Sequence, residues 1–542
     1  MQKTESKVSW AFKKIFLGVA SGLIVFALFM VLLNIIFPSS NYEISLDTER
    51  GISSKQRLSD FKDMTDFMEE HIPFIYDYEE LYGISFEDMK SYYTGLVGNA
   101  ESDYEYYCLI QGFINNIPSG HMTMGYPNED YIPMLYQQRT SDYPQFGQAC
   151  GYWERVLQNE CRKYYDKDYS VHAFYYLNGE YFESEYTNSE NNIPYSGAKL
   201  LSVNGVPADE FVKLCPLTCK LNYDFQNGKP FREILIFNNI SGEKCTVEYE
   251  TESGKVVSEN AFYGTSAVVS NYIEYFRSID RPEENENKEV PEIDEADIPN
   301  IYSFIDEERD VLYLKFNDFS QGGAEALLFI RENELPDNII IDLRENGGGM
   351  DGVCHSIIEA LSTKSFEYST AVYVTPEENE YLDYPAKKAG ELSFETKFKK
   401  LCEDIREEKF EGKSEREYNI YVLVSKNSIS ASDKFAAIIK DNDIGTVIGA
   451  FGTGGEAYGS PDIRVQTSSG LYFYYTPFKS LNRDGTDNSV YGTSPDIYVM
   501  LDKDFLKNRD ELFLRDEPYG TYENRLKWDS VLIRALEEIK KQ

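Results

Sequence analysis

Three kinds of hydrophobic pattern follow one another along the chain. Between residues 56 and 116 apolar positions recur every three or four residues, which predicts amphipathic helices, and a further helix is expected near residues 152–165. From His172 onward apolar and polar residues alternate in short runs, which predicts β-strands. Beyond residue 300 fully apolar runs alternate with helical segments, a pattern typical of a largely parallel sheet covered on both faces.

A continuous apolar run at residues 15–37 precedes these patterns, with Asn34 as its only strongly polar member. At ~1.5 Å per helical residue the run is long enough to cross a ~30 Å hydrocarbon core. Four lysines precede the run and no basic residue follows it directly, so the positive-inside rule places the N-terminus in the cytoplasm. A cleaved signal peptide is the alternative, but no Ala-x-Ala site follows. We therefore expect an uncleaved single-pass anchor with everything after Pro38 outside the cytoplasm.

Together the patterns predict a multidomain α/β protein. Residues 281–299 are acidic, contain proline and are nearly free of aromatics, so we expect a solvated linker. A calcium site is the less favoured alternative, because the carboxylates lack the spacing of a calcium loop. The predicted segments are a cytoplasmic tail (1–11), a transmembrane anchor (12–37), a mainly helical region (38–165), a β-rich domain (166–280), the acidic linker (281–300) and an α/β domain (301–542).

The amino-acid composition argues against several classes of function. Among 542 residues, 53 basic and 92 acidic side chains give a net charge of −39, which argues against binding nucleic acid. A hydrophobic content of 42%, with 43 Tyr and 33 Phe, is enough for folded cores. The eight cysteines contain no C-x-x-C pair, so zinc spacing is absent, and we predict neither a metal nor a cofactor.

The first candidate for chemistry is a strand-to-helix corner with the sequence IIIDLRENGGG, which ends at Gly349. Consecutive glycines allow a tight turn whose N–H groups can face an oxyanion or phosphate. No Lys-Ser/Thr pair follows them, which disfavours a nucleotide-binding loop. We expect Asp342 and Arg344 to brace this turn.

A second corner, with the sequence SKNSISASD, lies about eighty residues further on. Serines that open a helix usually cap it. Alternatively, one of them is a nucleophile, because the positive end of the helix dipole stabilises a developing oxyanion.

Taken together, the two corners resemble the carboxy-terminal processing (tail-specific) serine peptidase family. AKLLSVNGVP resembles part of that family's PDZ-like domain, and YGTSPDI resembles its closing segment. The resemblance implies a ClpP/crotonase-like α/β catalytic domain, a PDZ-like β-rich domain and polypeptide substrates. It places the nucleophile on Ser430 and the oxyanion donors on the backbone N–H groups of Ala431 and Gly348.

The catalytic base distinguishes two branches of that family. The lysine of the Ser–Lys branch would fall on Gly455, so a dyad mechanism fails here. The sequence PSGH, ending at His121, resembles the histidine turn of the tricorn-type Ser–His branch. His121 is therefore the predicted general base, with His355 as second choice and Lys479 as a less favoured alternative.

The sequence offers two candidates for the acid that would complete a Ser–His–acid triad. Ser489 stands where the Ser–His branch has its acid. Asp487 is the predicted replacement and Glu456 is the alternative, because orienting a histidine needs only a carboxylate within hydrogen-bond reach.

These expectations define two hypotheses. The first is a membrane-anchored, extracytoplasmic serine endopeptidase that forms an acyl-enzyme on Ser430. The second is a degenerate relative that binds extended peptides without cleaving them. Under either hypothesis the acidic charge favours neutral or basic peptides, and no pattern indicates an oligomeric state.

Overall fold

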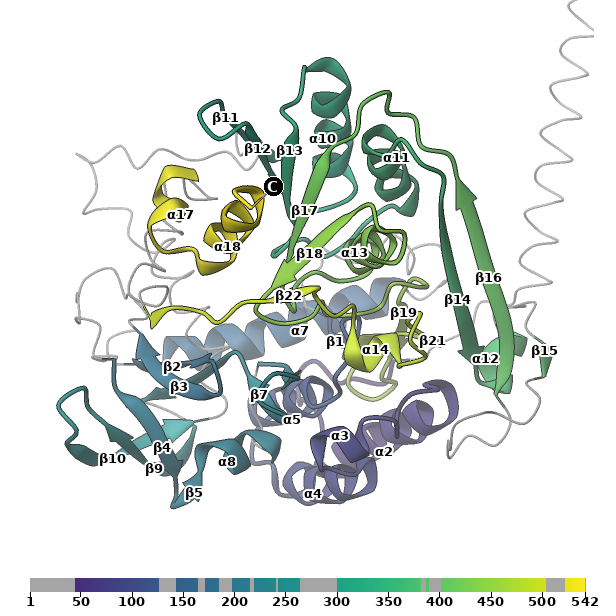
Figure 1. Ribbon diagram of the computed structural model, residues 1–542. Helices are drawn as coiled ribbons and strands as arrows, with labels where there is room; N and C mark the ends of the chain where they lie inside the picture. The colour runs from purple at the N-terminus through teal and green to yellow at the C-terminus, as the bar shows by residue number, and fades with distance from the viewer. Residues whose placement is uncertain are drawn as a thin grey trace, which may run out of the picture.

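A computed structural model describes the chain at residues 44–125, 143–163, 171–184, 197–214, 219–239, 242–263, 300–381, 387–388, 401–503 and 522–541 (Figure 1). The predicted anchor at 15–37 and the acidic segment at 281–299 lie outside these ranges. Within the ranges, no helix is both long enough and apolar enough to cross a membrane.

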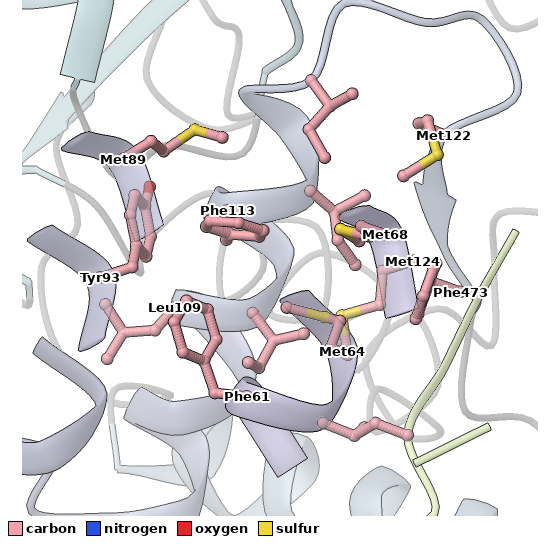
Figure 2. Packing of buried hydrophobic residues seen from close by; sticks show 14 of the residues in the cluster. Phe61, Met64, Met68, Met89, Tyr93, Leu109, Phe113, Met122, Met124 and Phe473 are labelled. Carbon is pink, nitrogen blue, oxygen red and sulfur yellow. The ribbon is translucent and has the colours of Figure 1, made fainter. Parts of the chain in front are cut away.

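The N-terminal part is helical, as the three- and four-residue periodicity predicts. Ser53, Ser85 and Ser102 cap the helices α2, α4 and α5, respectively, with their side chains. In Figure 2, Phe61 and Phe113 pack edge to face with ring centroids 5.0 Å apart, in a core that also includes Phe473 from a strand of the C-terminal part. The helices are α2 (Ser54–His71), α3 (Glu79–Tyr82), α4 (Phe86–Asn99), α5 (Asp103–Asn115) and α7 (Tyr143–Arg162).

The middle of the chain forms a β-rich unit. Its seven-stranded antiparallel sheet has the order β3-β2-β8-β10-β9-β4-β5, and an additional β3–β4 pairing closes the sheet on itself. The PDZ-like assignment of this unit rests on the sequence resemblance and stays a prediction. Its elements are β2 (Val171–Leu177), β3 (Glu180–Ser184), β4 (Lys199–Val203), β5 (Val206–Pro207), α8 (Ala208–Leu214), β6 (Leu221–Asp224), β7 (Lys229–Arg232), β8 (Ile234–Asn238), β9 (Glu243–Glu250) and β10 (Val256–Tyr263).

The C-terminal part is an α/β domain around a six-stranded sheet of order β11-β12-β13-β17-β18-β22, parallel except for β11. Helices cover both faces of this sheet, as predicted from strands that are apolar on both sides (Figure 1). Along β13, Ile339 and Ile341 pack toward α10, α11 and α13, while Ile340 packs toward α18. The elements are β11 (Ile301–Asp306), β12 (Val311–Phe316), α10 (Gln321–Glu332), β13 (Asn338–Asp342), α11 (Asp351–Leu361), β17 (Asn419–Val424), α13 (Ala431–Asp441), β18 (Gly445–Gly449), β22 (Ile497–Tyr498), α17 (Tyr522–Trp528) and α18 (Ser530–Ile539).

Two smaller sheets extend this domain. In one, β1 of the helical part pairs with β20, which joins the N-terminal and C-terminal parts of the chain. The remaining elements are β1 (Thr123–Met124), β14 (Phe366–Val374), α12 (Pro376–Tyr381), β15 (Lys387–Lys388), β16 (Cys402–Phe410), β19 (Asp462–Val465), β20 (Tyr472–Tyr475), β21 (Phe478–Ser480) and α14 (Asn488–Tyr491).

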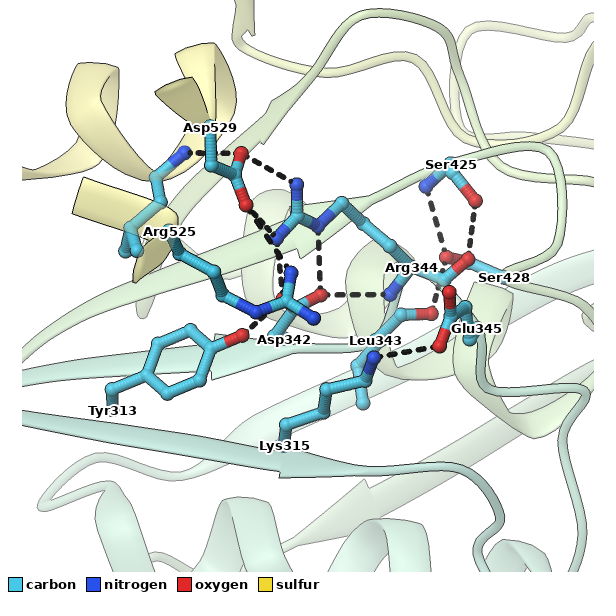
Figure 3. Close-up of polar contacts among 11 residues, drawn as sticks. Tyr313, Lys315, Asp342, Leu343, Arg344, Glu345, Ser425, Ser428, Arg525 and Asp529 are labelled. Atoms are coloured by element: carbon cyan, nitrogen blue, oxygen red, sulfur yellow. Dashed lines mark hydrogen bonds and ion pairs between the residues drawn. The ribbon is translucent and has the colours of Figure 1, made fainter. Parts of the chain in front are cut away.

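A buried ion-pair network braces the end of β13, as predicted for Asp342 and Arg344 (Figure 3). The Arg344 guanidinium donates to Asp342 Oδ1 at 2.9 Å and to Asp529 Oδ1 and Oδ2 at 2.8 and 2.7 Å. Burial opposes ionisation of Asp342, but the charge and hydrogen bonds of Arg344, together with the charges of Lys315 and Arg525, outweigh it and hold the pKa of this carboxyl below its usual value. The network ties the start of the glycine turn to the C-terminal helices.

Removing one partner from this network tests its contribution to stability. Asp529→Ala leaves the buried charges of Arg344 and Arg525 undercompensated, so we expect the free energy of unfolding to fall by ~3–5 kcal/mol. Urea unfolding followed by circular dichroism measures the change. Glu537→Ala is the matched control, because Glu537 is exposed in α18. Equal stability of the two variants would contradict this account of the network.

Candidate active site

Ser430 stands immediately before α13 in a strained backbone conformation, with φ 59° and ψ −121°. A non-glycine residue in this region costs ~1–3 kcal/mol, and such strain concentrates at functional sites. The Ser430 side chain makes no capping hydrogen bond. Its backbone N–H donates to Gly455 O at 2.9 Å, which fixes the turn. The backbone therefore fixes the position of the Ser430 Cβ, which carries the hydroxyl.

The neighbouring serines have different roles. Ser428 Oγ donates to Leu343 O at 2.7 Å, and Ser432 Oγ donates to Asn346 Oδ1 at 2.5 Å. Both side chains are buried. Among these three serines, Ser430 alone has no hydrogen bond from its hydroxyl to a described residue, which supports its assignment as the nucleophile.

The glycine turn lies directly against Ser430. Gly348 has φ 106°, and a Cβ atom added there would lie 2.7 Å from Ser430 Cβ and 2.8 Å from Ile429 O. The Gly348 N–H donates to Asn346 Oδ1 at 3.0 Å, so it is not available to an oxyanion in this conformation. Ala431 N–H, at the start of α13, has no partner within the described ranges. Of the two predicted oxyanion donors, Ala431 is the one whose N–H group is open.

His121 follows α5 in a turn that packs against the serine loop. A Cβ atom added to Gly120 would lie 2.7 Å from Ile429 Cγ2 and 3.3 Å from Glu456 Cγ. His121 Nδ1 lies 3.0 Å from Thr476 Oγ1 and 3.8 Å from Glu456 Oε2. The fold thus brings together a turn and a helix start that are about three hundred residues apart in the sequence.

Glu456 is the carboxylate that faces His121. Its side chain is 1% exposed, and its backbone has φ 69°. It accepts a hydrogen bond from Ser119 Oγ and lies 3.4 Å from Ser489 Oγ. Burial raises the Glu456 pKa to about 7, although the hydroxyls of Ser119 and Thr476 oppose this shift.

The state of His121 follows from its own surroundings. Its side chain is 9% exposed. Burial lowers the His121 pKa to about 3, and the positive charge of Lys220 adds to this effect. At neutral pH the imidazole is consequently uncharged, which is the form that accepts a proton from a serine hydroxyl.

The prediction that Asp487 orients the histidine is not supported by the structure. Asp487 caps α14 by accepting from Ser489 N at 2.9 Å, and it lies 3.3 Å from Lys479 Nζ. Lys479 also pairs with Asp77 at 2.6 Å, so this lysine is committed to an ion-pair cluster. The alternative acid, Glu456, is the one that lies near His121, with its Oε2 3.8 Å from Nδ1. Sequence spacing did not reveal this, because the positions of both carboxylates depend on the geometry of the loops that carry them.

The other histidines are engaged elsewhere. His355, the second choice for the base, lies in α11 at 3.6 Å from Glu408 and packs against Phe410. His71 and His172 pair with Glu378 and Glu183, respectively. In the parts of the chain that the structure describes, no group of three or more His, Cys, Asp or Glu side chains is arranged to hold a metal ion.

Residues 310–499, which contain both corners, match the family described as peptidase family S41. The chain carries a peptidase family S41 domain. This is a family of serine peptidases, so the family relationship predicted from the two corners is confirmed. No curated protein matches the chain.

Solved structures similar to this chain share little sequence with it. Mature CPAF complexed with lactacystin is 13% identical, with a TM-score of 0.47, over 90% of this chain and 99% of that one. The photosystem II D1 C-terminal processing protease is 13% identical, with a TM-score of 0.33, over 86% and 99%. The tricorn protease is 14% identical, with a TM-score of 0.31, over 90% and 37%. The family assignment rests on the S41 match itself.

Three residues around the S41 site were missed by the sequence reasoning. Ser119 directly precedes the PSGH glycine, so its place in the turn is a signal that points to it. Thr476 follows β20 directly and Lys220 comes from the β-rich unit, and no local pattern marks either of them.

The glycine turn of the S41 domain provides a matched pair of variants. We expect Gly348→Ala to displace Ser430 and to lower kcat/KM by at least ~100-fold, because the new Cβ would clash with backbone and φ is positive. Gly347→Ala is the control, since a Cβ at Gly347 meets nothing within 4 Å. Hydrolysis of fluorescent casein measures both. Similar activity in the two variants would show that the close approach is unimportant.

Proposed function

We propose that this protein is a serine endopeptidase whose site consists of Ser430, His121 and Glu456. One observation carries the proposal: a strained serine with an open hydroxyl, at the start of a helix, adjoins a turn whose histidine faces a buried carboxylate. Serine, histidine and carboxylate in this order are the components of nucleophilic acyl transfer.

Each group has a distinct role in the proposed reaction. His121 Nδ1 faces Thr476 and Glu456, which leaves Nε2 for the Ser430 hydroxyl. Nε2 accepts the hydroxyl proton while Ser430 Oγ attacks the peptide carbonyl carbon, and the resulting oxyanion accepts a hydrogen bond from Ala431 N–H. His121 then gives the proton to the departing amine as the C–N bond breaks. Water, deprotonated by His121, hydrolyses the acyl-enzyme and releases Ser430 with its proton restored.

Glu456 has an electrostatic role in this scheme. When His121 becomes an imidazolium in the transition state, a negative Glu456 at 3.8 Å stabilises it. Because Glu456 has a pKa of about 7, its ionised fraction increases as the pH rises through neutrality. Activity is accordingly expected to rise over that range.

A labelling experiment tests the triad. Ser430→Ala is expected to abolish labelling by a fluorophosphonate probe and hydrolysis of fluorescent casein. His121→Ala and Glu456→Gln are expected to lower kcat/KM by ~100-fold or more. His355→Ala is the matched control and should stay within about threefold of the wild type, because His355 contacts Glu408 and Phe410 rather than Ser430, His121 or Glu456.

The outcomes separate the two hypotheses. Retained labelling in Ser430→Ala would refute the nucleophile. Loss of activity in Asp487→Asn but not in Glu456→Gln would restore Asp487 as the orienting acid. A folded wild-type protein that neither reacts with the probe nor cleaves casein would favour the peptide-binding relative without catalysis.

The location of the protein is a separate proposal based on sequence. The apolar run at 15–37 would anchor the chain in the cell membrane with the S41 domain outside the cytoplasm. There the net charge of −39 would repel acidic peptides and favour neutral or basic ones.

Membrane association can be measured directly. The full chain should remain in the membrane fraction after carbonate washing, and deletion of residues 12–37 should release it, because ~20 apolar residues supply the partition energy. Release of the intact full chain by carbonate would contradict the anchor.

A further inference from the structure

Lys220 connects the β-rich unit to the turn that carries His121. It lies immediately before β6, and its Nζ donates to Ser119 O and to Gly120 O, both at 2.7 Å. The Gly120 carbonyl belongs to the peptide bond that leads into His121. Two hydrogen bonds from one ammonium group therefore fix the backbone on which the imidazole is mounted.

A second cation of the same unit holds the other end of this segment. Arg232 of β7 is fully buried, donates to Val212 O at 2.9 Å and also donates to Asn116 Oδ1. Asn116 is the C-cap of α5. Between Asn116 and His121 the chain is consequently held by the β-rich unit at both ends, with Lys220 nearer to the chemistry.

The charge of Lys220 acts on the same groups as its hydrogen bonds. Its positive charge acts electrostatically on Glu456 and His121. Burial lowers the Lys220 pKa to about 8, and the charge of Glu456 opposes this shift. Asp487 also faces Glu456, but with the opposite effect on that carboxyl, and Asp487 is paired with Lys479. A positive charge at this place favours ionised Glu456 and disfavours the imidazolium.

We propose that Lys220 is a positioning residue through which the β-rich unit orients His121 and sets the charge balance of the His121–Glu456 pair. This proposal rests on the proposed role of His121 as the base. It makes the β-rich unit a part of the active site in addition to any role in holding substrate. Dissociation of the unit from the turn would leave the base without its orientation.

Two substitutions in the full chain separate charge from hydrogen bonding. Lys220→Met is expected to lower the rate of fluorophosphonate labelling by at least ~10-fold. It should also move the acidic limb of the pH–rate profile to higher pH, because without the positive charge both His121 and Glu456 take up protons more readily. Lys220→Arg keeps the charge and should restore the position of the acidic limb. Lys213→Met, on α8, is the control, since Lys213 pairs only locally with Glu210 among the described residues.

A second readout needs no activity. In the full chain labelled with ¹³C-histidine, the signal absent from His121→Gln identifies His121 among the four histidines. We expect Lys220→Met to raise the pKa of that signal in a Ser430→Ala background. A slower labelling rate with an unchanged acidic limb and an unchanged His121 titration would overturn the proposal and leave Lys220 a purely structural role. Absence of labelling in the wild type would refute the peptidase function, while the titration would still decide the role of Lys220.

Discussion

The parallel pairing of β13 with β17 is the constraint on which the site depends. Ile340 pairs with Tyr421 and Asp342 with Leu423, so the two strands end at the same edge of the sheet. Asn346, beyond β13, then accepts hydrogen bonds from the Gly348 N–H and from Ser432 of α13. The glycine turn and the serine helix are thereby joined side by side. This is the place where open α/β sheets commonly carry their function.

Around this edge the protein places ionisable groups in surroundings that shift their pKa values in opposite directions. Burial makes His121 harder to protonate and Glu456 easier to protonate. Such divergence is common where acid and base roles are divided between neighbouring groups. The free energy required to bury them is offset by hydroxyl groups from separate parts of the chain, namely those of Ser119 and Thr476.

Local signals in the sequence were sufficient for much of this architecture. Apolar strands followed by a glycine turn or a serine-rich helix start predicted the α/β sheet, the bracing role of Asp342 and Arg344, and the resemblance that the S41 domain match bears out. Local signals did not show which carboxylate, Asp487 or Glu456, lies beside His121. Asp487 lies closer to the family's acid position, but Lys479 engages it, and that pairing depends on how β21 and α14 fold together. The role of Lys220 could not be predicted from the sequence, because Lys220 belongs to the β-rich unit while its partners, Ser119 and Gly120, belong to the helical part.

The backbone conformation of Ser430 has an evolutionary consequence. A glycine at this position would adopt the same φ and ψ without the strain that a Cβ imposes. A relative released from selection for the hydroxyl would therefore gain stability by acquiring glycine there. Under the proposed function, a single substitution of Ser430 by glycine would thus remove the nucleophile while relieving backbone strain.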